Sequence, residues 1–303
     1  MGALYENGVD QGGTTGCEAP VLTVAIPCHD EVEQLSRVLA GLAAQRGGAD
    51  DFEVVLVDNN SEDPRLEEVW RAHREHLALT LLRQPPLEHP MALCRARNSA
   101  LAIARGTWFW TLDSDSIPSP GYLAALRERL AAGAEDERPM LTGERIYIAA
   151  EGVPEAEIAA GGGALASAPT ILSASNYERP RDRRFPEIER LPDLPHPWDY
   201  MLGGNTVFRR EDALAVGGYD EGFDGHWGYE DDEFAYRMIS GRGCVPEFVE
   251  GLVVYHQDPT SPPGWRRHAK EENPNWHRAC RLIPGYREQK LKRYAEHGIT
   301  VNV

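Results

Sequence analysis

Three apolar, strand-like segments each end in a cluster of polar residues, and this repeated pattern constrains the fold more than any single motif. The segments are VLTVAIP at 21–27, FEVVLV at 52–57 and TWFWTL at 107–112. Continuous apolar runs of this kind are typical of strands buried on both faces of a parallel sheet. Stretches with helical spacing alternate with them, at residues 31–44, 64–76 and 91–104. The alternation predicts an α/β fold, with a mixed, mainly parallel sheet flanked by helices.

The polar clusters follow the strands directly: CHDE at 28–31, DNN at 58–60 and DSD at 113–115. In parallel α/β sheets, ligands bind beyond the carboxyl ends of the strands. We therefore expect the three clusters to line one binding site.

The composition excludes several classes of partner. A formal net charge of −17 disfavours a general nucleic-acid binder or a binder of anionic membranes, which would need a basic face. We expect no integral membrane segment and no signal peptide, because no apolar run is long enough and the first residues are polar. The five cysteines are scattered without paired spacing, which is typical of reduced thiols and predicts a cytoplasmic protein. Nothing in the sequence indicates the oligomeric state.

Two segments have a different texture. Residues 1–20 are polar and Gly-rich, and we expect a disordered tail. Residues 151–197 contain a Gly triplet, many prolines and four arginines between 179 and 184, which predicts a mobile loop or lid. These arginines could contact a phosphate or an anionic acceptor, although a solvated loop face is the simpler interpretation. Between the two segments we also expect a helix at 121–132 and a strand at 140–148. After the second segment, we expect two helices at the end of the chain.

The tripeptide Asp113-Ser114-Asp115 is the first candidate for chemistry. On an extended chain, side chains two residues apart point the same way, with Cα atoms about 6 to 7 Å apart. One carboxylate can then hold a divalent cation while the other reaches a hydroxyl of the same ligand. Acid-X-acid sequences are common in acidic proteins, so the position directly after a buried strand gives this motif its weight.

His256 is the second candidate. It follows the short apolar strand LVVY at 252–255, which would deliver it to a sheet edge where an earlier carboxylate could meet it. Carboxylate oxygen plus one imidazole suits Mn²⁺ better than Ca²⁺, with Mg²⁺ possible. A lone histidine at a strand end is more often structural, and that alternative stays open.

The third candidate is a run of four acids, residues 230–233, that follows Trp227 and Tyr229. An apolar platform beside a carboxylate can bind a sugar face while the carboxylate takes a proton. Successive helical residues are about 100° apart, so at most one or two of the acids face one cleft, and we expect the others to face solvent or cap the helix. We also expect the neighbouring charges to raise the pKa of the active carboxyl. Alternatively, the acids only complement the dipole of a helix start.

Taken in order, these motifs resemble the family 2 glycosyltransferases with the Rossmann-like GT-A fold. PCHDE at 27–31, VDNNS at 57–61, ARN at 96–98 and LDSD at 112–115 correspond to that family's motifs. The later half is similar to β-1,4-galactosyltransferases and bacterial chondroitin polymerases, through GGN at 203–205, GGYDEGF at 217–223, HWGYEDDEF at 226–234 and YHQ at 255–257. The resemblance covers about residues 21–260, without the 151–197 loop or the last forty residues.

The resemblance implies a single large domain, with a nucleotide-sugar-binding half at 21–150 and an acceptor-binding and catalytic half at 198–303. It implies roles for individual residues. Donor binding falls to Pro27, His29, Glu31 (ribose), Asp58 (uracil), Arg97, Asp113 and Ser114. The residues that would bind the metal (Mn²⁺ or Mg²⁺) are Asp113, Asp115 and His256. Those that would bind the acceptor are Gly204, Trp227, Tyr229 and Asp232. Asp231 would be the catalytic base, with Glu230 as a second catalytic residue. Two positions depart from the family's pattern. His29 stands where the family usually has Tyr, near the base of the donor. Tyr229 stands where the galactosyltransferases have Gly, on the acceptor side, which leaves the identity of the acceptor open.

The resulting hypothesis is an inverting, metal-dependent glycosyltransferase. It would move a hexose or N-acetylhexosamine from a UDP-sugar to a hydroxyl of a carbohydrate, peptide or small-molecule acceptor. The alternatives are a GDP-sugar-dependent transferase and a non-catalytic module that binds a nucleotide sugar or glycan. A nucleotidyltransferase is disfavoured, since it would need a Gly-rich, basic phosphate-binding loop after the first strand. The sequence at that position, PCHDEVEQL at 27–35, contains no Gly, Lys or Arg.

Overall fold

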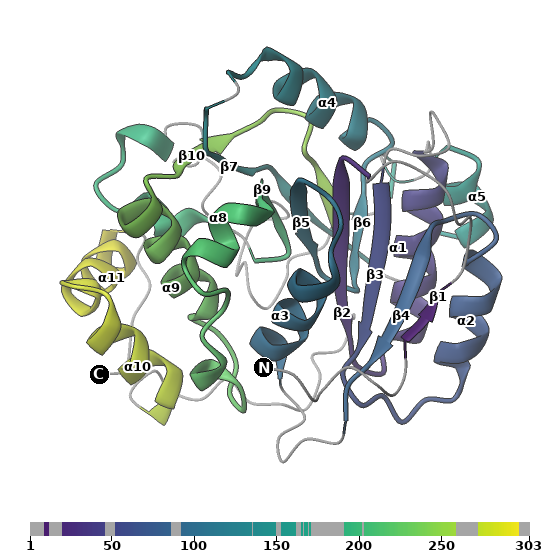
Figure 1. Ribbon diagram of the computed structural model, residues 1–303, viewed down its shortest axis with the longest axis horizontal. Coiled ribbons are helices and arrows are strands. Elements are labelled where there is room, and N and C mark those ends of the chain that lie inside the picture. Colours follow the sequence, from purple (N-terminus) through teal and green to yellow (C-terminus); the bar gives the residue numbers. More distant parts are fainter. Residues whose placement is uncertain are drawn as a thin grey trace.

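A mixed sheet of eight strands runs through the centre of the molecule (Figure 1). The computed structural model describes residues 9–11, 20–45, 52–85, 92–134, 136–149, 153–161, 165, 167–168, 170, 191–201, 203–258 and 272–296. The strand order is β1-β4-β3-β2-β5-β9-β7-β10. The strands are β1 (Val9–Gln11), β2 (Leu22–Cys28), β3 (Phe52–Asp58), β4 (Leu79–Arg83), β5 (Trp108–Leu112), β7 (Pro139–Thr142), β9 (Asn205–Arg209) and β10 (Val245–Phe248).

The sheet is parallel through its central strands. β4, β3, β2 and β5 pair in parallel, as do β7 and β10, whereas β1 and β9 run antiparallel to their neighbours. The predicted mixed, mainly parallel α/β sheet flanked by helices is thus confirmed.

Helices cover both faces of the sheet, because its strands are apolar on both faces. Val54 and Leu56 of β3 pack into one core with α1 and α2, and Val55 and Val57 pack into a second core with α3, α9 and α10. The helices are α1 (Val32–Ala44), α2 (Arg65–His73), α3 (Leu93–Ile103), α4 (Tyr122–Ala132), α5 (Glu155–Ala159), α8 (Arg210–Ala215), α9 (Glu230–Tyr236), α10 (Pro274–Leu282) and α11 (Tyr286–Glu296). Short 3₁₀ turns lie at Leu191–Asp193, Pro197–Tyr200 and Glu221–Phe223, and a π-helical turn at Arg237–Gly241 follows α9.

A second sheet of three strands brings distant segments of the chain together. Its order is β6 (Ser116–Pro118), β11 (Val254–Asp258) and β8 (Arg145–Ala149). The single strand predicted at 140–148 is wrong, since β7 and β8 belong to different sheets. The chain passes from one sheet to the other at Gly143, where a Cβ atom would lie 1.9 Å from the carbonyl oxygen of Leu252.

The N-terminal segment differs in part from the prediction of a disordered tail. Val9–Gln11 forms β1, which pairs antiparallel with Thr80–Leu82 of β4 and covers what would otherwise be the edge of the sheet. The other residues before Pro20 lie outside the described residues. So does most of the predicted 151–197 loop, including its four arginines, although α5 lies within that loop and packs against α1.

Among the residues described, none of the helices combines the length and the apolar character that a membrane crossing needs.

Replacing Gly143 should destabilise the junction between the two sheets. Gly143→Ala places a methyl group against the Leu252 backbone, which cannot move aside as a side chain could, and we expect a loss of about 2 kcal/mol in the free energy of unfolding. Urea denaturation measures this loss. Gly241→Ala is the matched control, because a Cβ there meets nothing within 4 Å. Equal stability of the two variants would contradict the tight contact.

Candidate active site

The first two polar clusters form one wall at the carboxyl ends of β2 and β3. Cys28 pairs with Asp58 in the parallel register, so the loops that follow are neighbours. Asp30 accepts hydrogen bonds from the backbone N–H groups of Glu62 and Asp63, at 2.6 and 2.9 Å. The adjoining loops are therefore tied together by side-chain-to-backbone bonds.

His29 and Asp58 are both fixed in this wall. The Nδ1 atom of His29 lies 2.9 Å from the carbonyl oxygen of Asn59, and because a carbonyl only accepts, Nδ1 carries the proton. Asp58 accepts a hydrogen bond of 2.8 Å from the backbone N–H of Ser61, and Nε of Arg83 lies 3.9 Å from its other oxygen. The two candidate donor-binding side chains thus have defined orientations.

The third cluster meets this wall through Ser114. Its hydroxyl donates a short hydrogen bond to Glu31. Burial, followed by the nearby charges of Asp115 and Asp113, raises the pKa of Glu31 to about 7, against the opposing effect of the Ser114 bond. Burial and the Asp113 charge likewise raise the pKa of Asp115. Several carboxyl groups therefore repel one another in a small, partly dry space.

Strand register places His256 beside Asp115. His256 of β11 pairs with Ser116 of β6, and the N–H of Gln257 donates to the carbonyl of Asp115 at 2.9 Å. As a result, Nε2 of His256 lies 3.2 Å from a carboxylate oxygen of Asp115. Two segments about 140 residues apart in sequence thus present an oxygen and a nitrogen ligand at one point.

This pair fits a divalent cation of the Mn²⁺ or Mg²⁺ type. Such ions are often held by only one or two protein ligands, and water and substrate phosphates supply the rest. Over the described part of the chain, no group of three or more His, Cys, Asp and Glu side chains is arranged to hold a metal. The residues present therefore fit an ion that is completed by a ligand, and not a closed structural site.

Arg97 joins the metal-side acids to the predicted catalytic acid. Its side chain is 2% exposed, and its guanidinium lies 2.8 Å from Asp231, 3.4 Å from Glu230 and 3.5 Å from Asp113. The same group stands 5.2 Å from the centre of the Tyr219 ring. Arg97, expected to bind the donor, is thus enclosed by carboxylates of the protein itself.

Gly203 and Gly204 make room for two of these carboxylates. A Cβ at Gly203 would lie 2.0 Å from an oxygen of Asp231, and a Cβ at Gly204 would lie 1.9 Å from an oxygen of Asp113. The N–H of Gly203 also donates to Asp231 at 3.2 Å. Gly204, which was predicted to contact the acceptor, therefore packs against the carboxylate of Asp113.

The four acids that begin α9 face different neighbours. Asp231 remains 32% exposed on its side chain, whereas Glu230, Asp232 and Glu233 are buried. Glu233 pairs with Arg237 at 2.6 Å, and Asp232 accepts from Tyr286 and pairs with Lys290 at 2.8 Å. The expectation that the other acids face solvent or cap the helix is wrong: among the described residues no side chain caps α9, and Arg97, α11 and Arg237 cover Glu230, Asp232 and Glu233. Asp232, expected at the acceptor, lies against α11.

The two aromatic residues before α9 point in different directions. Trp227 is 46% exposed, as a platform for a ligand would be. Tyr229 adopts a left-handed conformation with φ of 72°, and its ring lies 5.5 Å from that of Trp276 and 6.4 Å from that of Tyr286. The sequence did not identify three C-terminal residues that contact the start of α9, because they belong to no motif. They are Trp276, Tyr286 and Lys290.

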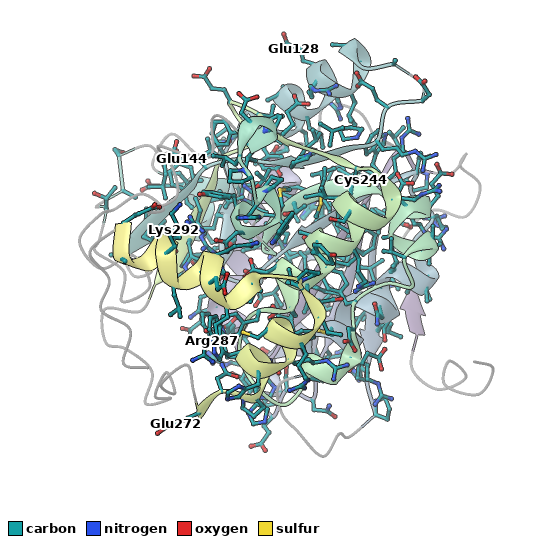
Figure 2. All side chains as sticks on the ribbon, turned by 90° about the vertical axis from the view of Figure 1, so that its left-hand side faces the viewer. Glu128, Glu144, Cys244, Glu272, Arg287 and Lys292 are labelled. Atoms are coloured by element: carbon teal, nitrogen blue, oxygen red, sulfur yellow. The ribbon has the colours of Figure 1, made fainter. Side chains whose placement is uncertain are left out.

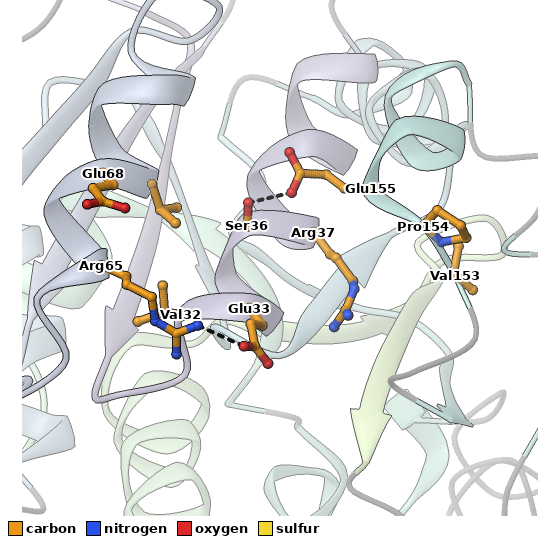
Figure 3. A pocket seen from close by; sticks show the side chains of 10 residues that line it. Val32, Glu33, Ser36, Arg37, Arg65, Glu68, Val153, Pro154 and Glu155 are labelled. Carbon is orange, nitrogen blue, oxygen red and sulfur yellow. Dashed lines mark hydrogen bonds and ion pairs between the residues drawn. The ribbon is translucent and has the colours of Figure 1, made fainter.

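A separate hollow of about 370 Å³ lies between α1, α2 and α5 (Figure 3). Several of its polar side chains already have partners: Arg65 pairs with Glu33 at 2.9 Å, the hydroxyl of Ser36 donates to Glu155 at 2.6 Å, and Arg37 donates to Gln257 at 3.1 Å. Because these groups are bonded within the protein, we do not assign a ligand to this hollow.

The environment of Glu230 predicts a pH effect on stability. Burial, and then the Asp231 charge, raise its pKa to about 8, so the folded state favours the protonated form. The resulting stabilisation is complete below the unfolded-state pKa of about 4.5 and is lost as the pH rises through about 8. Glu230→Gln removes this titration, so the free energy of unfolding should fall less between pH 6 and pH 9 than in the wild type. The expected difference is on the order of 1 kcal/mol.

Denaturation at several pH values measures this slope. Glu128→Gln, at an exposed position on α4 (labelled in Figure 2), is the control and should keep the wild-type slope. An unchanged slope in Glu230→Gln would show that Glu230 is ionised in the folded protein.

Two models of known families match the chain. Residues 23–143 match the model of glycosyl transferase family 2, and residues 183–251 match a model described as the N-terminal domain of galactosyltransferase. The first match contains the strand-end clusters, and the second contains the Gly203-Gly204 turn and the acids of α9.

Relatives in sequence and structure agree with these matches. A chondroitin synthase of Escherichia coli is 29% identical over 247 residues, which cover 78% of this chain and 35% of that protein. The chain thus spans about a third of the length of this relative. The crystal structure of S. aureus TarS 1–349 in complex with UDP-GlcNAc has a TM-score of 0.60 and 17% identity, covering 85% of this chain and 64% of that one. The structure of GalNAc-T7 with UDP, GalNAc and Mn²⁺ has a TM-score of 0.59 and 22% identity, covering 87% and 48%.

At these identities the structural likeness shows the fold alone. The chain therefore carries a glycosyl transferase family 2 domain at residues 23–143, followed by a galactosyltransferase-type segment at residues 183–251, on the fold of the GT-A glycosyltransferases.

Proposed function

We propose that this protein is an inverting, metal-dependent transferase that moves a hexose or N-acetylhexosamine from a UDP-sugar to an acceptor hydroxyl. One observation carries the proposal: the buried guanidinium of Arg97 contacts both Asp113 and Asp231. An acid suited to a donor and its cation and the acid suited to an acceptor thus lie around the same buried guanidinium.

The wall formed by the loops after β2 and β3 is the proposed donor site. Asp58 would accept a hydrogen bond from the uracil ring, and Glu31 would contact the ribose. Their fixed orientation supports this assignment, since a site that is already ordered loses less entropy on binding. The UDP-GlcNAc and UDP in two structural neighbours, and the GDP-Man in a third, support a nucleotide-sugar donor in a fold of this kind.

Asp115 and His256 would hold the Mn²⁺ or Mg²⁺ ion, with Asp113 beside them. When bound, the cation would neutralise negative charge on the diphosphate leaving group. The protein's own contribution is the fixed pair of ligands, held by backbone bonds between β6 and β11. The Mn²⁺ in the GalNAc-T7 structure supports a cation in a fold of this kind.

Asp231 is the proposed general base. Arg97 holds one of its oxygens and the N–H of Gly203 holds the other, so the carboxylate has one orientation while part of it stays exposed. It would take the proton of the acceptor hydroxyl as that oxygen forms a bond to the anomeric carbon. The bond from that carbon to the diphosphate breaks on the opposite face, which inverts the configuration in one step.

The experiment that tests the proposal is a screen of UDP- and GDP-sugars for nucleotide release with Mn²⁺ and with Mg²⁺. We expect release from at least one UDP-sugar. A preference for GDP-sugars would overturn the assignment of Asp58 to uracil. Calorimetric binding of a donor without any hydrolysis or transfer would favour a non-catalytic binding module.

Removing the proposed base should abolish most of the transfer. Asp231→Asn keeps the shape and can still contact Arg97, but it takes no proton, so we expect kcat to fall at least about 100-fold while donor affinity stays within about twofold. Steady-state kinetics and calorimetry measure the two quantities. Asp193→Asn, an exposed carboxylate in the turn before Pro197, is the control. Turnover of Asp231→Asn within a few-fold of wild type would remove Asp231 from this role.

Removing either metal ligand should weaken cation binding. We expect Asp115→Asn and His256→Ala each to reduce the affinity for Mn²⁺, titrated in the presence of UDP, by at least about tenfold. His76→Ala, an exposed histidine after α2, should leave the affinity unchanged. Wild-type Mn²⁺ binding in both site variants would place the cation elsewhere.

A further inference from the structure

The loop Phe223–Tyr229, called here the acceptor loop, carries the exposed Trp227 and leads directly into the acids of α9. It begins with the last residue of the 3₁₀ turn Glu221–Phe223 and runs to the start of α9, without helix or strand after Phe223. Gly225, Gly228 and Tyr229 all have positive φ angles, of 95°, 91° and 72°. A backbone of this kind does not hold its own shape, so contacts from elsewhere must define it.

Two asparagines at the start of α10 supply those contacts. The side-chain NH₂ of Asn275 lies 2.8, 2.9 and 3.1 Å from the carbonyl oxygens of Phe223, His226 and Gly228, so its two N–H donors are shared among three acceptors. The amide of Asn273 donates to the carbonyl of Trp227 at 2.9 Å. Both asparagines are buried, so these bonds have no competition from bulk water. Two side chains thus bind the carbonyls of four residues in one loop.

The last residue of the loop and the acids after it are also held by the C-terminal helices. The ring of Tyr229 packs against those of Trp276 and Tyr286, and Asp232 is bound by Tyr286 and by Lys290. Figure 2 shows α10 and α11 lying over this side of the molecule, with Glu272 near the start of α10 and Arg287 and Lys292 on α11. These helices lie beyond residue 251, where the second family match ends.

The carbonyl bonds of the acceptor loop and the donor wall come from different parts of the chain. The donor wall is formed by β2, β3 and the loops that follow them. The loop is bound at its carbonyls by α10, while Asp224 connects its start to α3 by accepting from the N–H groups of Cys94 and Arg95 at 2.8 and 3.1 Å. Loosening α10 from the loop should therefore disturb the acceptor side more than the donor side.

We propose that Asn273 and Asn275 are positioning residues for the acceptor: they hold Trp227 in place as the apolar platform for an acceptor sugar beside Asp231. This inference rests on the proposed glycosyltransferase function and deepens it. The C-terminal helices would then determine how well an acceptor is used, although they contribute no group to the reaction.

Asn273→Asp is the sharpest test, because it separates two roles of one side chain. The Oδ1 atom of Asn273 accepts from the N–H of Asn275 at 2.9 Å and so caps α10. An aspartate caps a helix equally well, and its negative charge interacts favourably with the positive N-terminal end of the helix dipole. A carboxylate, however, cannot donate to the carbonyl of Trp227. A second variant, Asn275→Ala, removes the contacts to the carbonyls of Phe223, His226 and Gly228. If Asn275→Ala does not fold, Asn273→Asp alone still decides the test.

Each variant is compared with wild type by two measurements. The first is the ratio of transfer to hydrolysis for the UDP-sugar that the donor screen identifies, with p-nitrophenyl glycosides as acceptor probes and water as the competing acceptor. The second is hydrogen exchange of the amides of residues 223–229. Arg281→Gln, at an exposed position on α10, is the control.

For Asn273→Asp we expect the ratio to fall about tenfold through a higher KM for the glycoside, because a displaced platform misaligns the acceptor. Exchange in residues 223–229 should become faster, and Arg281→Gln should change neither quantity. Unchanged exchange in Asn273→Asp would overturn the proposal, as would an equal loss of hydrolysis and transfer. If the wild-type protein uses no sugar donor, the proposed function fails and the platform role fails with it, whereas the exchange data still decide whether α10 holds the loop.

Discussion

The buried guanidinium of Arg97 is the interaction on which the arrangement of the site depends. A charge that is 2% exposed is tolerated only when opposite charges surround it, and removing the partners of a buried ion typically costs about 3–5 kcal/mol. The partners of Arg97 come from the end of β5 and from the start of α9, segments that are distant in sequence. Satisfying this one cation therefore fixes where the two halves of the chain meet. The glycines at 203 and 204 complete the arrangement, because any side chain there would push the acids away from the guanidinium.

The acid run at the start of α9 illustrates how one short sequence can serve several purposes. Helical geometry turns its members toward different neighbours. Glu230 faces Arg97, Asp231 faces Arg97 and Gly203, Asp232 faces α11, and Glu233 faces Arg237 in the π-helical turn that follows α9. Only Asp231 keeps substantial exposure, so the residue suited to chemistry is singled out by the burial of the others. The run both stabilises the contact between α9 and the C-terminal helices and leaves one carboxylate accessible.

Much of the fold could be predicted from the sequence, because buried parallel strands leave a clear apolar pattern and their polar ends mark the site. The adjacency of Asp115 and His256 was expected as a possibility, but it depends on the pairing of His256 with Ser116, and strand pairing leaves no signal in a single sequence. The change of sheet at Gly143 was missed, since the residues on either side of it form one continuous strand-like run. The role of Asn275 was equally hidden, because its partners are backbone carbonyls, which every residue carries.

The register of β11 also limits how this part of the protein can change in evolution. Side chains alternate along a strand, so adding or deleting a single residue within β11 would turn the imidazole of His256 to the opposite side and bring Tyr255 or Gln257 to Asp115 instead. The same shift would take the amide of Gln257 away from its present bonds to α1 and to the Asp115 backbone. Length variation among homologues should therefore be tolerated in the connections on either side of this strand, and hardly at all within it.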